Sequence, residues 1–278
     1  MKNKVSIIEV LGQKINKQSF DVVTSSHLEP NLGNRKTMED YLIHEPDLCG
    51  NGKFSLFAVL DGHGGHEVAE FFAKHFPAIL ARKLEVYEGV FTLEDCIMMS
   101  LDNIENQLRM LNKRETGSTF CAILLDNFLN EMYIVNIGDS QALQVACEAD
   151  NRLSGGFLCK AHKTSNFDEV KRITMNGGTV FNGRVGGYLM VTRSLGDFGL
   201  KKYGVISTPD IQRFDMDGPN LVVLASDGIW DVIKTEDVMS YLVKNQNLDC
   251  EDLGNLLIEE AVKKGSLDNI SVICILIG

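Results

Sequence analysis

Short apolar runs bounded by turn-forming residues recur along the chain and predict β-strands. Five of them are rich in β-branched or aromatic residues and are flanked by Gly, Asp or Asn. They cover Phe54–Leu60, 119–125, Glu131–Ile137, Asn220–Ala225 and Ile270–Ile277. The second and third of these strands are separated by a gap of hairpin length. The chain also has more predicted strands than a regular alternation of strand and helix would give. The pattern therefore favours antiparallel sheets over a doubly wound parallel sheet.

Helices are indicated by capping residues that precede apolar positions three and four apart. Thr92 begins a capping-box sequence, Thr-Leu-Glu-Asp, before apolar residues at helical spacing: Ile97, Leu101, Ile104, Leu108 and Leu111. Ser165 begins a second such helix, which is expected to stop at Gly177. Further helices are expected at Glu67–Leu84, Thr235–Lys244 and 249–264. Pro77 should bend or split the first of these.

The composition is that of a globular protein, because 44% of the 278 residues are hydrophobic and 23% are charged. These values exclude a disordered, collagen-like or coiled-coil chain. No Gly/Ser-rich linker or charge block divides the sequence. We therefore expect one domain, residues 21–278, after a short leader, residues 1–20.

Charge and cysteine content narrow the choice of partners and compartment. The net charge of −11 repels nucleic-acid phosphates and anionic lipids, so we expect neither nucleic acid nor a membrane as a partner. Glu9 interrupts the apolar N-terminal stretch before it reaches signal-peptide length. The seven cysteines lack a Cys-x-x-Cys pair, and five lie in apolar surroundings, which predicts reduced, mainly buried thiols. These features favour the cytoplasm or the nucleus.

Four aspartates lie at the ends of apolar strands. Asp61, Asp139 and Asp227 follow strands, whereas Asp268 precedes the last one, so the four can meet only if that strand runs opposite to the others. Gathered carboxylates repel one another unless a cation compensates them. Oxygen-only ligands select Mg²⁺ or Mn²⁺ over zinc. For any one of these aspartates alone, an ordinary turn is the simpler interpretation.

An arginine and two more acids occur together near the N-terminus. Arg35 precedes Glu39 and Asp40, and a guanidinium beside a metal site suits binding of a phosphate dianion. Two metal ions about 4 Å apart activate water for attack on phosphorus, which makes phosphoester hydrolysis the natural reaction. Taken singly, each of these residues has a simpler interpretation. Arg35 is then one partner of a surface ion pair, Glu39 and Asp40 belong to a solvated edge, and His63 is an ordinary loop histidine.

Eight motifs together resemble those of the metal-dependent serine/threonine protein phosphatases of type 2C, the PPM family. The resemblance runs from about residue 34 to residue 277. In family order, the motifs are at residues 35–40, 59–65, 117–119, 138–140, 171–178, 192–197, 226–231 and 268–269. The resemblance implies the α+β class, as an αββα sandwich of two mainly antiparallel sheets flanked by helices, with the metal site at one end.

The same resemblance implies roles for individual residues. Two Mg²⁺ or Mn²⁺ ions would be bridged by Asp61, and the carbonyl of Gly62 would bind the first of them. The other implied metal-site residues are Asp227 and Asp268 on the second ion, Glu39 and Asp40 on metal-bound waters, and Asp139 with Asp231 on a weaker third ion. Arg35 would bind the substrate phosphate, and His63 would be the general acid for the leaving seryl or threonyl oxygen.

Other motif residues are interpreted as structural. Arg193 and Asp197 are expected to form an ion pair around a turn, and Trp230 to anchor the core. Thr119 is either a brace of the metal site or a half-buried strand residue. Gln141 and the sequence Ala-His-Lys-Thr at residues 161–164 depart from the usual family pattern. These departures leave open the details of a flap at residues 159–187, which helps relatives choose substrates.

We therefore expect a monomeric phosphatase that acts on phosphoprotein substrates by direct attack of water, without a phosphoenzyme. A cysteine nucleophile and a Ser/His/Asp triad are disfavoured, because neither has suitable neighbours in the sequence. Two alternatives stay open. One is an inactive phosphatase-like docking module, which would usually have lost a metal ligand. The other is hydrolysis of a small phosphomonoester or a phosphodiester at the same site.

Overall fold

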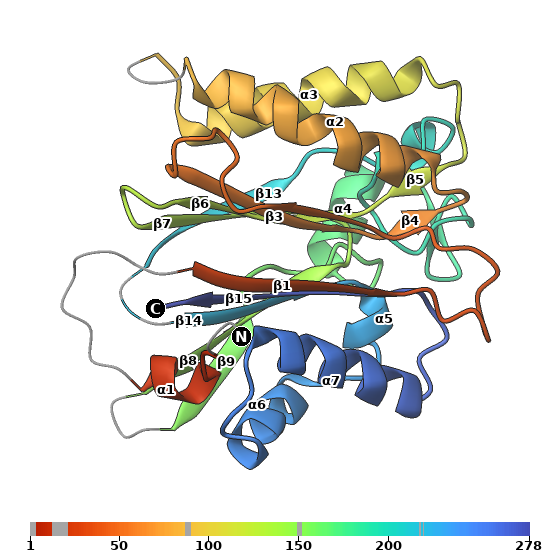
Figure 1. The fold of residues 1–278 in the computed structure, drawn as a ribbon. Coiled ribbons are helices and arrows are strands. Elements are labelled where there is room, and N and C mark those ends of the chain that lie inside the picture. Colours follow the sequence, from red (N-terminus) through yellow and green to blue (C-terminus); the bar gives the residue numbers. More distant parts are fainter. Residues whose placement is uncertain (1–3, 13–21, 87–89, 149–151, 217, 219) are drawn as a thin grey trace.

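Two antiparallel sheets lie face to face, with helices on both outer faces (Figure 1). The structure is a computed structural model that describes residues 4–12, 22–86, 90–148, 152–216, 218 and 220–278. The first sheet has the order β13 (Asp210–Asp215), β7 (Glu131–Ile137), β6 (Phe120–Asp126), β3 (Phe54–Leu60), β2 (Tyr41–Glu45). The second has the order β1 (Val22–Glu29), β15 (Ile270–Ile277), β14 (Asn220–Ala225), β8 (Gln141–Cys147), β9 (Leu153–Phe157). This is the α+β sandwich expected from the sequence.

Three apolar layers hold the sandwich together. The helices α2 (Glu67–Leu84) and α3 (Leu93–Arg109) pack on the first sheet through one buried cluster. A second cluster fills the space between the sheets. A third joins the second sheet to α1 (Ile7–Leu11), α5 (Asp227–Trp230), α6 (Thr235–Lys244) and α7 (Cys250–Lys263). Because each sheet buries both faces, strands such as β3 and β15 are buried along their whole length and consist mainly of apolar residues.

Small elements gather at one end of the two sheets (Figure 1). A three-stranded sheet there has the order β12 (Leu195–Gly196), β5 (Gly117–Ser118), β4 (Gly62–His63). The flap contains α4 (Phe167–Met175), β10 (Val180–Phe181) and β11 (Arg184–Val185), and a 3₁₀ turn follows at Lys201–Tyr203. The flap shares a small core with the segment that follows it, in which Ile173, Val185 and Val205 are buried.

The predicted elements are confirmed with local differences. The capping box at Thr92 is present, with hydrogen bonds in both directions between Thr92 and Asp95. The cap of α4 is Asn166 rather than Ser165, because the Asn166 side chain accepts the Asp168 N–H at 3.0 Å. Of the two outcomes predicted for Pro77, a bend or a split, the split does not occur, since α2 continues through the proline.

Side-chain packing explains why α2 continues through its proline. Phe72, Phe76 and Leu80 are all buried against the first sheet on either side of Pro77. Phe72 stacks on Phe76 with ring centroids 4.6 Å apart. Most helical stability in proteins comes from burying such an apolar face, and here it outweighs the hydrogen bond that a proline removes.

The N-terminal helix α1 is packed against the rest of the protein. In α1, Ile7 is buried, and its N–H donates to the Leu248 carbonyl at 2.9 Å. The predicted division between leader and domain at residue 20 falls outside the described residues.

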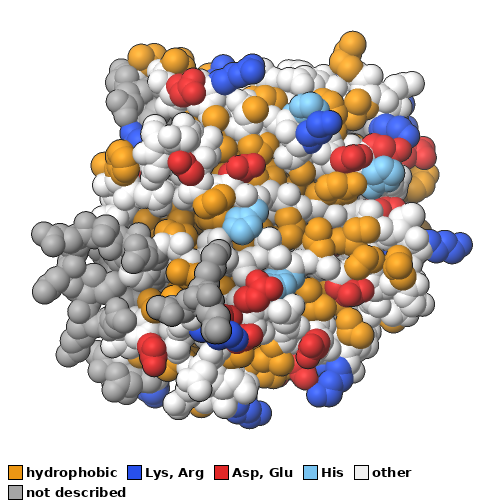
Figure 2. Space-filling view, in the orientation of Figure 1, with side chains coloured by type: hydrophobic (Ala, Val, Ile, Leu, Met, Phe, Trp, Pro, Cys, Tyr) orange, Lys and Arg blue, Asp and Glu red, His pale blue; other side chains and the backbone are white. Residues whose placement is uncertain are grey.

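Among the described residues, no helix is long and apolar enough to cross a bilayer. Acidic and basic side chains are interspersed on the face shown in Figure 2.

Candidate metal centre and active site

Three carboxylates lie close together at the end of the sandwich where the small elements gather. They follow strands that belong to both sheets. Asp61 follows β3, Asp139 follows β7, and Asp227 begins α5 after β14. One oxygen from each lies within 4.8 Å of the others. Asp268 precedes β15, which is antiparallel to β14, so it reaches the same edge, as its strand direction predicted. All four line one pocket of about 270 Å³.

Burial and mutual repulsion make this cluster costly without a cation. Burial, followed by the charges of Asp40 and Asp227, raises the pKa of Asp61 well above its usual range. Burial and the Asp139 carboxylate raise the pKa of Asp227 to about 7. Burial likewise raises the pKa of Asp40 to about 7. An all-carboxylate set with this excess of negative charge fits Mg²⁺ or Mn²⁺ rather than zinc.

Two cationic side chains already approach the cluster. The Lys163 ammonium lies 3.1 Å from an Asp139 oxygen and 4.0 Å from an Asp227 oxygen. The Arg35 guanidinium forms an ion pair with Asp268, and its Nε donates to the Leu267 carbonyl at 3.1 Å. Arg35 therefore forms the ion pair that is its simpler interpretation, and its half-exposed side chain also lines the pocket of the acids.

Thr119 braces the first of the acids, as the sequence allowed. The Asp61 N–H donates to the Thr119 hydroxyl at 3.0 Å, and the Thr119 N–H donates to the Asp61 carbonyl at 2.9 Å. The same hydroxyl lies 2.8 Å from the Ser140 hydroxyl. Thr119 is 2% exposed, so these contacts are shielded from water. The end of β3 is therefore fixed to the segment that carries Asp139.

A single asparagine fixes the loop that carries Glu39. The Asn269 side-chain amide donates to the carbonyls of Pro30 and Thr37, and its oxygen accepts the Glu39 N–H at 2.9 Å. A Cβ added at Gly62 would lie 2.3 Å from the Glu39 carbonyl oxygen. Only a glycine lets the Glu39 and Asp61 segments come this close.

The two acids of the N-terminal motif differ in their surroundings. The Glu39 carboxylate accepts hydrogen bonds from the Thr37 hydroxyl at 3.0 Å and from the Gly65 N–H at 3.3 Å. Asp40 is 3% exposed and accepts a 2.5 Å hydrogen bond from the Ser271 hydroxyl. Asp40 therefore links the first sheet's edge to β15, next to Asp268.

His63 is bonded to a buried acid. Its Nε2 lies 2.6 Å from an oxygen of Asp197, which is 1% exposed and also accepts a 2.6 Å hydrogen bond from the Ser194 hydroxyl. The three-stranded sheet explains the contact, since His63 pairs with Gly117, and Gly117 pairs with the residue before Asp197. A Cβ at Gly117 would lie 2.1 Å from the Asp197 carboxylate.

The predicted ion pair between Arg193 and Asp197 was wrong. Arg193 instead pairs with Glu169 at 2.6 Å and with Asp210 at 2.7 Å. Asp197 has a φ of +46°, and its side chain is directed to His63. Residues four apart face one another in a helix, but this segment is a strand end and a turn, so the spacing carried no such information.

The remaining motif residues lie at the rim. Asp231 follows α5, has a side chain that is 66% exposed, and lies 3.5 Å from the Lys163 ammonium. Trp230 packs against the apolar cluster of the second sheet, and its indole N–H donates to the carbonyls of Gln141 and Ala225. The structure supports its interpretation as an anchor of the core.

Sequence reasoning missed three side chains at this end of the molecule. Lys163 was noted only as part of a departure from the family pattern, Asp197 was given the wrong partner, and Glu169 was not singled out. Each makes at least one contact with a residue far away in the sequence, for example Glu169 with Arg193 and Asp197 with His63. The available signals were the position of Asp197 within a family motif and that of Lys163 within residues 161–164, which depart from the family pattern.

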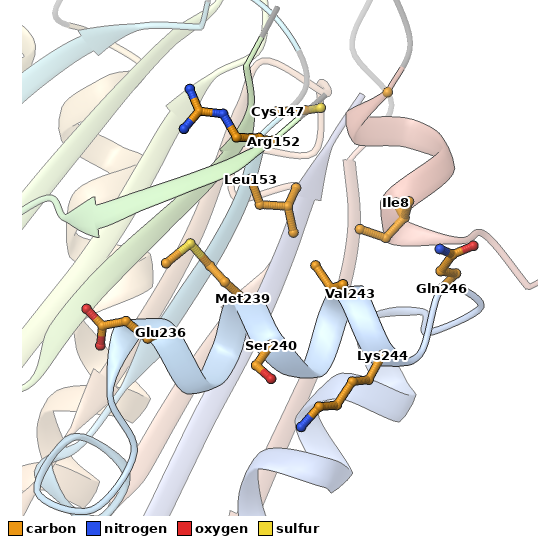
Figure 3. Close-up of a pocket in the computed structure, with 11 residues that line it drawn as sticks. Ile8, Cys147, Arg152, Leu153, Glu236, Met239, Ser240, Val243, Lys244 and Gln246 are labelled. Atoms are coloured by element: carbon orange, nitrogen blue, oxygen red, sulfur yellow. The ribbon is translucent and has the colours of Figure 1, made fainter. Parts of the chain in front are cut away.

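A second cavity, of about 780 Å³, lies between α1, α6 and the β8–β9 pair (Figure 3). Ile8, Leu153, Met239 and Val243 supply much of its lining, and charged side chains such as Lys244 stand at its edge. The acids described above are not among its lining residues. We place the candidate active site in the smaller pocket, because that pocket holds the grouped carboxylates.

Comparisons with known proteins agree with this arrangement. The family model described as "Protein phosphatase 2C" matches residues 26–270, which include all the site residues discussed above. The chain therefore belongs to the protein phosphatase 2C family.

Individual relatives are similar over most of the chain. "Probable protein phosphatase 2C 71" from Arabidopsis thaliana is 32% identical, over 87% of this chain and 53% of its own length. "Protein phosphatase 1L" from Bos taurus is 33% identical, over 87% of this chain and 69% of its own. A solved structure of "a C.elegans sex determining protein" has a TM-score of 0.78 at 26% identity, covering 92% of this chain and 64% of its own. The chain thus spans about half to two thirds of these relatives.

Proposed function

We propose that this chain is a metal-dependent protein phosphatase that hydrolyses phosphoserine and phosphothreonine in protein substrates. The observation that carries the proposal is the group formed by Asp61, Asp139 and Asp227, in one pocket with Arg35 and His63. Family membership supports the same reaction. We further propose that the protein acts as a monomer in the cytoplasm or nucleus, with residues 21–278 as its catalytic domain.

The chain's own residues define where the ions would bind. Asp61 would bridge two Mg²⁺ or Mn²⁺ ions, with the Gly62 carbonyl on the first and Asp227 and Asp268 on the second. Glu39 and Asp40 would bind the surrounding waters, and Asp139 with Asp231 would take a weaker third ion. Bound metal would lower the pKa of a water and draw electron density from the phosphoryl oxygens, so that water attacks phosphorus directly.

Arg35 would orient the phosphate. Its guanidinium is half exposed and pairs with Asp268. With Asp268 engaged as a metal ligand, the Arg35 guanidinium would be available for a phosphate dianion, which it can bind through two parallel N–H donors. The same arginine thus balances Asp268 before substrate binds and neutralises substrate charge afterwards.

His63 would protonate the leaving oxygen. Its Nε2 is engaged by Asp197 at 2.6 Å, so Nδ1 is the ring nitrogen left to face a substrate. In the imidazolium form both ring nitrogens are donors, so Nδ1 can hold a proton while Nε2 stays bonded to Asp197. A proton held at Nδ1 would pass to the seryl or threonyl oxygen as its bond to phosphorus breaks.

The first experiment is hydrolysis of a phosphothreonine peptide by the purified protein. Turnover is expected with Mn²⁺, should stop with excess EDTA, and should return when Mn²⁺ is restored. A folded protein that binds Mn²⁺ but turns over no peptide would instead favour the docking-module alternative.

A substrate comparison separates the second alternative. Phosphothreonine peptide, a small phosphomonoester and a phosphodiester are compared by kcat/KM under the same Mn²⁺ concentration. We expect the peptide to be the best substrate. Preferential turnover of the diester or the small monoester would contradict a protein phosphatase.

A further inference from the structure

Lys163 places a fixed positive charge inside the acidic cluster. It lies in the connection between β9 and α4, where its backbone forms an isolated bridge with Val191. Its ammonium is 3.1 Å from Asp139, 3.5 Å from Asp231 and 4.0 Å from Asp227. One lysine therefore contacts three carboxylates, one that follows β7 and two at the start and end of α5.

The contacts are partly shielded from solvent. The Lys163 side chain is 25% exposed, and that of Asp139 is 5% exposed. Charges in such a position interact more strongly than they do on an open surface, because water and salt screen them less. The ammonium therefore compensates the charge of Asp139 most directly, because that carboxylate is the nearest of the three.

The ammonium also lies against the two acids that would hold a further metal ion. Asp139 and Asp231 are the pair proposed above for the weaker third ion, and Lys163 lies within 3.5 Å of both. A divalent ion there would meet a positive charge at close range and would share its ligands with it. Binding requires the lysine side chain to leave.

We propose that Lys163 is an internal competitor for the third metal ion. This inference rests on the proposed metal-dependent function. The lysine would keep the Asp139–Asp231 position weak, so that this position fills only at high metal concentration. The positions built on Asp61 and Asp268 would stay available at low metal concentration.

The test is direct measurement of Mn²⁺ binding. Wild-type protein and Lys163→Met are titrated by calorimetry and by the electron paramagnetic resonance signal of free Mn²⁺. Methionine keeps the length of the side chain but removes its charge. We expect the weakest binding event to tighten about tenfold or more, because a like charge in direct contact has been removed. The two tighter events should change little.

Matched variants identify the cause. Lys160→Met removes an equal charge from an exposed position three residues earlier and should leave all binding events unchanged. Lys163→Arg keeps the charge and should keep the weak event weak. The double variant Lys163→Met/Asp231→Asn should lose the tightened event.

The outcomes separate this inference from the proposed function. If wild-type protein binds no Mn²⁺, the metal-dependent function fails. If it binds two ions and Lys163→Met leaves the weakest event unchanged, the lysine is not a competitor. Circular dichroism checks the fold of each variant, and Lys163→Gln replaces Lys163→Met if the latter does not fold.

Discussion

Side-chain pairs that meet across the small three-stranded sheet fix the geometry of the candidate general acid. His63 on β4 and Asp197 after β12 lie on either side of Gly117, which has no side chain to separate them. Asp197 is buried, and one of its oxygens, Oδ1, lacks a hydrogen-bond partner. Burying a carboxylate with an unpaired oxygen costs folding free energy. In return, the Asp197 carboxylate is held in position to accept the hydrogen bond from His63.

Removing the imidazole should therefore affect difficult leaving groups most. His63→Gln is expected to lower kcat for a phosphothreonine peptide about a hundredfold or more, but kcat for p-nitrophenyl phosphate much less, because an aryl oxygen leaves without a proton. Steady-state kinetics on both substrates measure the difference. His66→Gln, in the next turn, is the control. An equal loss on both substrates would remove His63 from the acid role.

Asp197 should act through His63 rather than on the substrate. Asp197→Asn keeps a hydrogen-bond acceptor and should lose about tenfold in kcat with KM unchanged, whereas Asp197→Ala should lose more. As for His63, the loss should be larger with the peptide than with the aryl phosphate. A uniform loss on both substrates, or a change in KM alone, would indicate a purely structural role.

Asp227 tests the metal centre itself. Asp227→Asn removes a ligand charge but little volume, so metal-dependent turnover should disappear while the fold is retained. Peptide hydrolysis at increasing Mn²⁺ and circular dichroism measure the two effects. Asp215→Asn, at an exposed position on β13, is the control. Normal turnover in Asp227→Asn would mean that the metal centre is misplaced.

The acids could be predicted from the sequence because each stands beside an apolar run whose direction is set by the sheet. Asp61 and Asp139 follow strands that both pair with β6, so they emerge at the same edge. The partners of Asp197 and Arg193 could not be predicted in the same way. They depend on a backbone turn with φ of +46° and on α4, which is more than 20 residues away.

At the scale of elements, one buried glutamate ties the flap to the body of the protein. Glu169 on α4 accepts hydrogen bonds from Arg193 and from the Thr192 hydroxyl, as well as from Arg172 on its own helix. Burial alone would raise its pKa, but these hydrogen bonds lower the pKa of Glu169 to about 2. Leu189 and Val191, which line the active-site pocket, lie between the flap and the residues Thr192 and Arg193 that Glu169 binds.

Neutralising Glu169 should cost stability in a pH-dependent way. A carboxylate whose pKa is lower in the folded than in the unfolded protein stabilises the fold at pH values above its unfolded pKa, which is about 4.3. This contribution is lost as the pH falls toward 2. Glu169→Gln should therefore destabilise by about 3 kcal/mol at pH 7, and by progressively less below about pH 4. Urea unfolding at several pH values measures both. Glu259→Gln, exposed on α7, is the control.

A pH-independent difference between wild type and Glu169→Gln would contradict the ion-pair account. It would point instead to packing of the glutamate side chain. A loss that appears in peptide hydrolysis but not in unfolding would indicate that Glu169 positions the flap without stabilising the whole fold.

At the scale of the whole molecule, the acidic cluster joins the two sheets. Asp61 and Asp139 extend from the first sheet, whereas Asp227 and Asp268 belong to the second. The apolar cluster between the sheets holds them together from within, and the carboxylates repel at one end. An ion that binds carboxylates from both sheets would therefore stabilise the native state as a whole.

Mn²⁺ should accordingly raise the thermal unfolding midpoint. A ligand that binds only the native state at about a hundred times its dissociation constant contributes about 2.7 kcal/mol, which corresponds to about 5 °C or more for a chain of this size. Calorimetry with Mn²⁺ and with EDTA measures the shift, and NaCl at matched ionic strength controls for screening of the acids. Asp227→Asn should respond much less. If NaCl gave the same shift, or if Asp227→Asn responded like wild type, the stabilisation would come from general screening, because only a specific ion depends on that ligand.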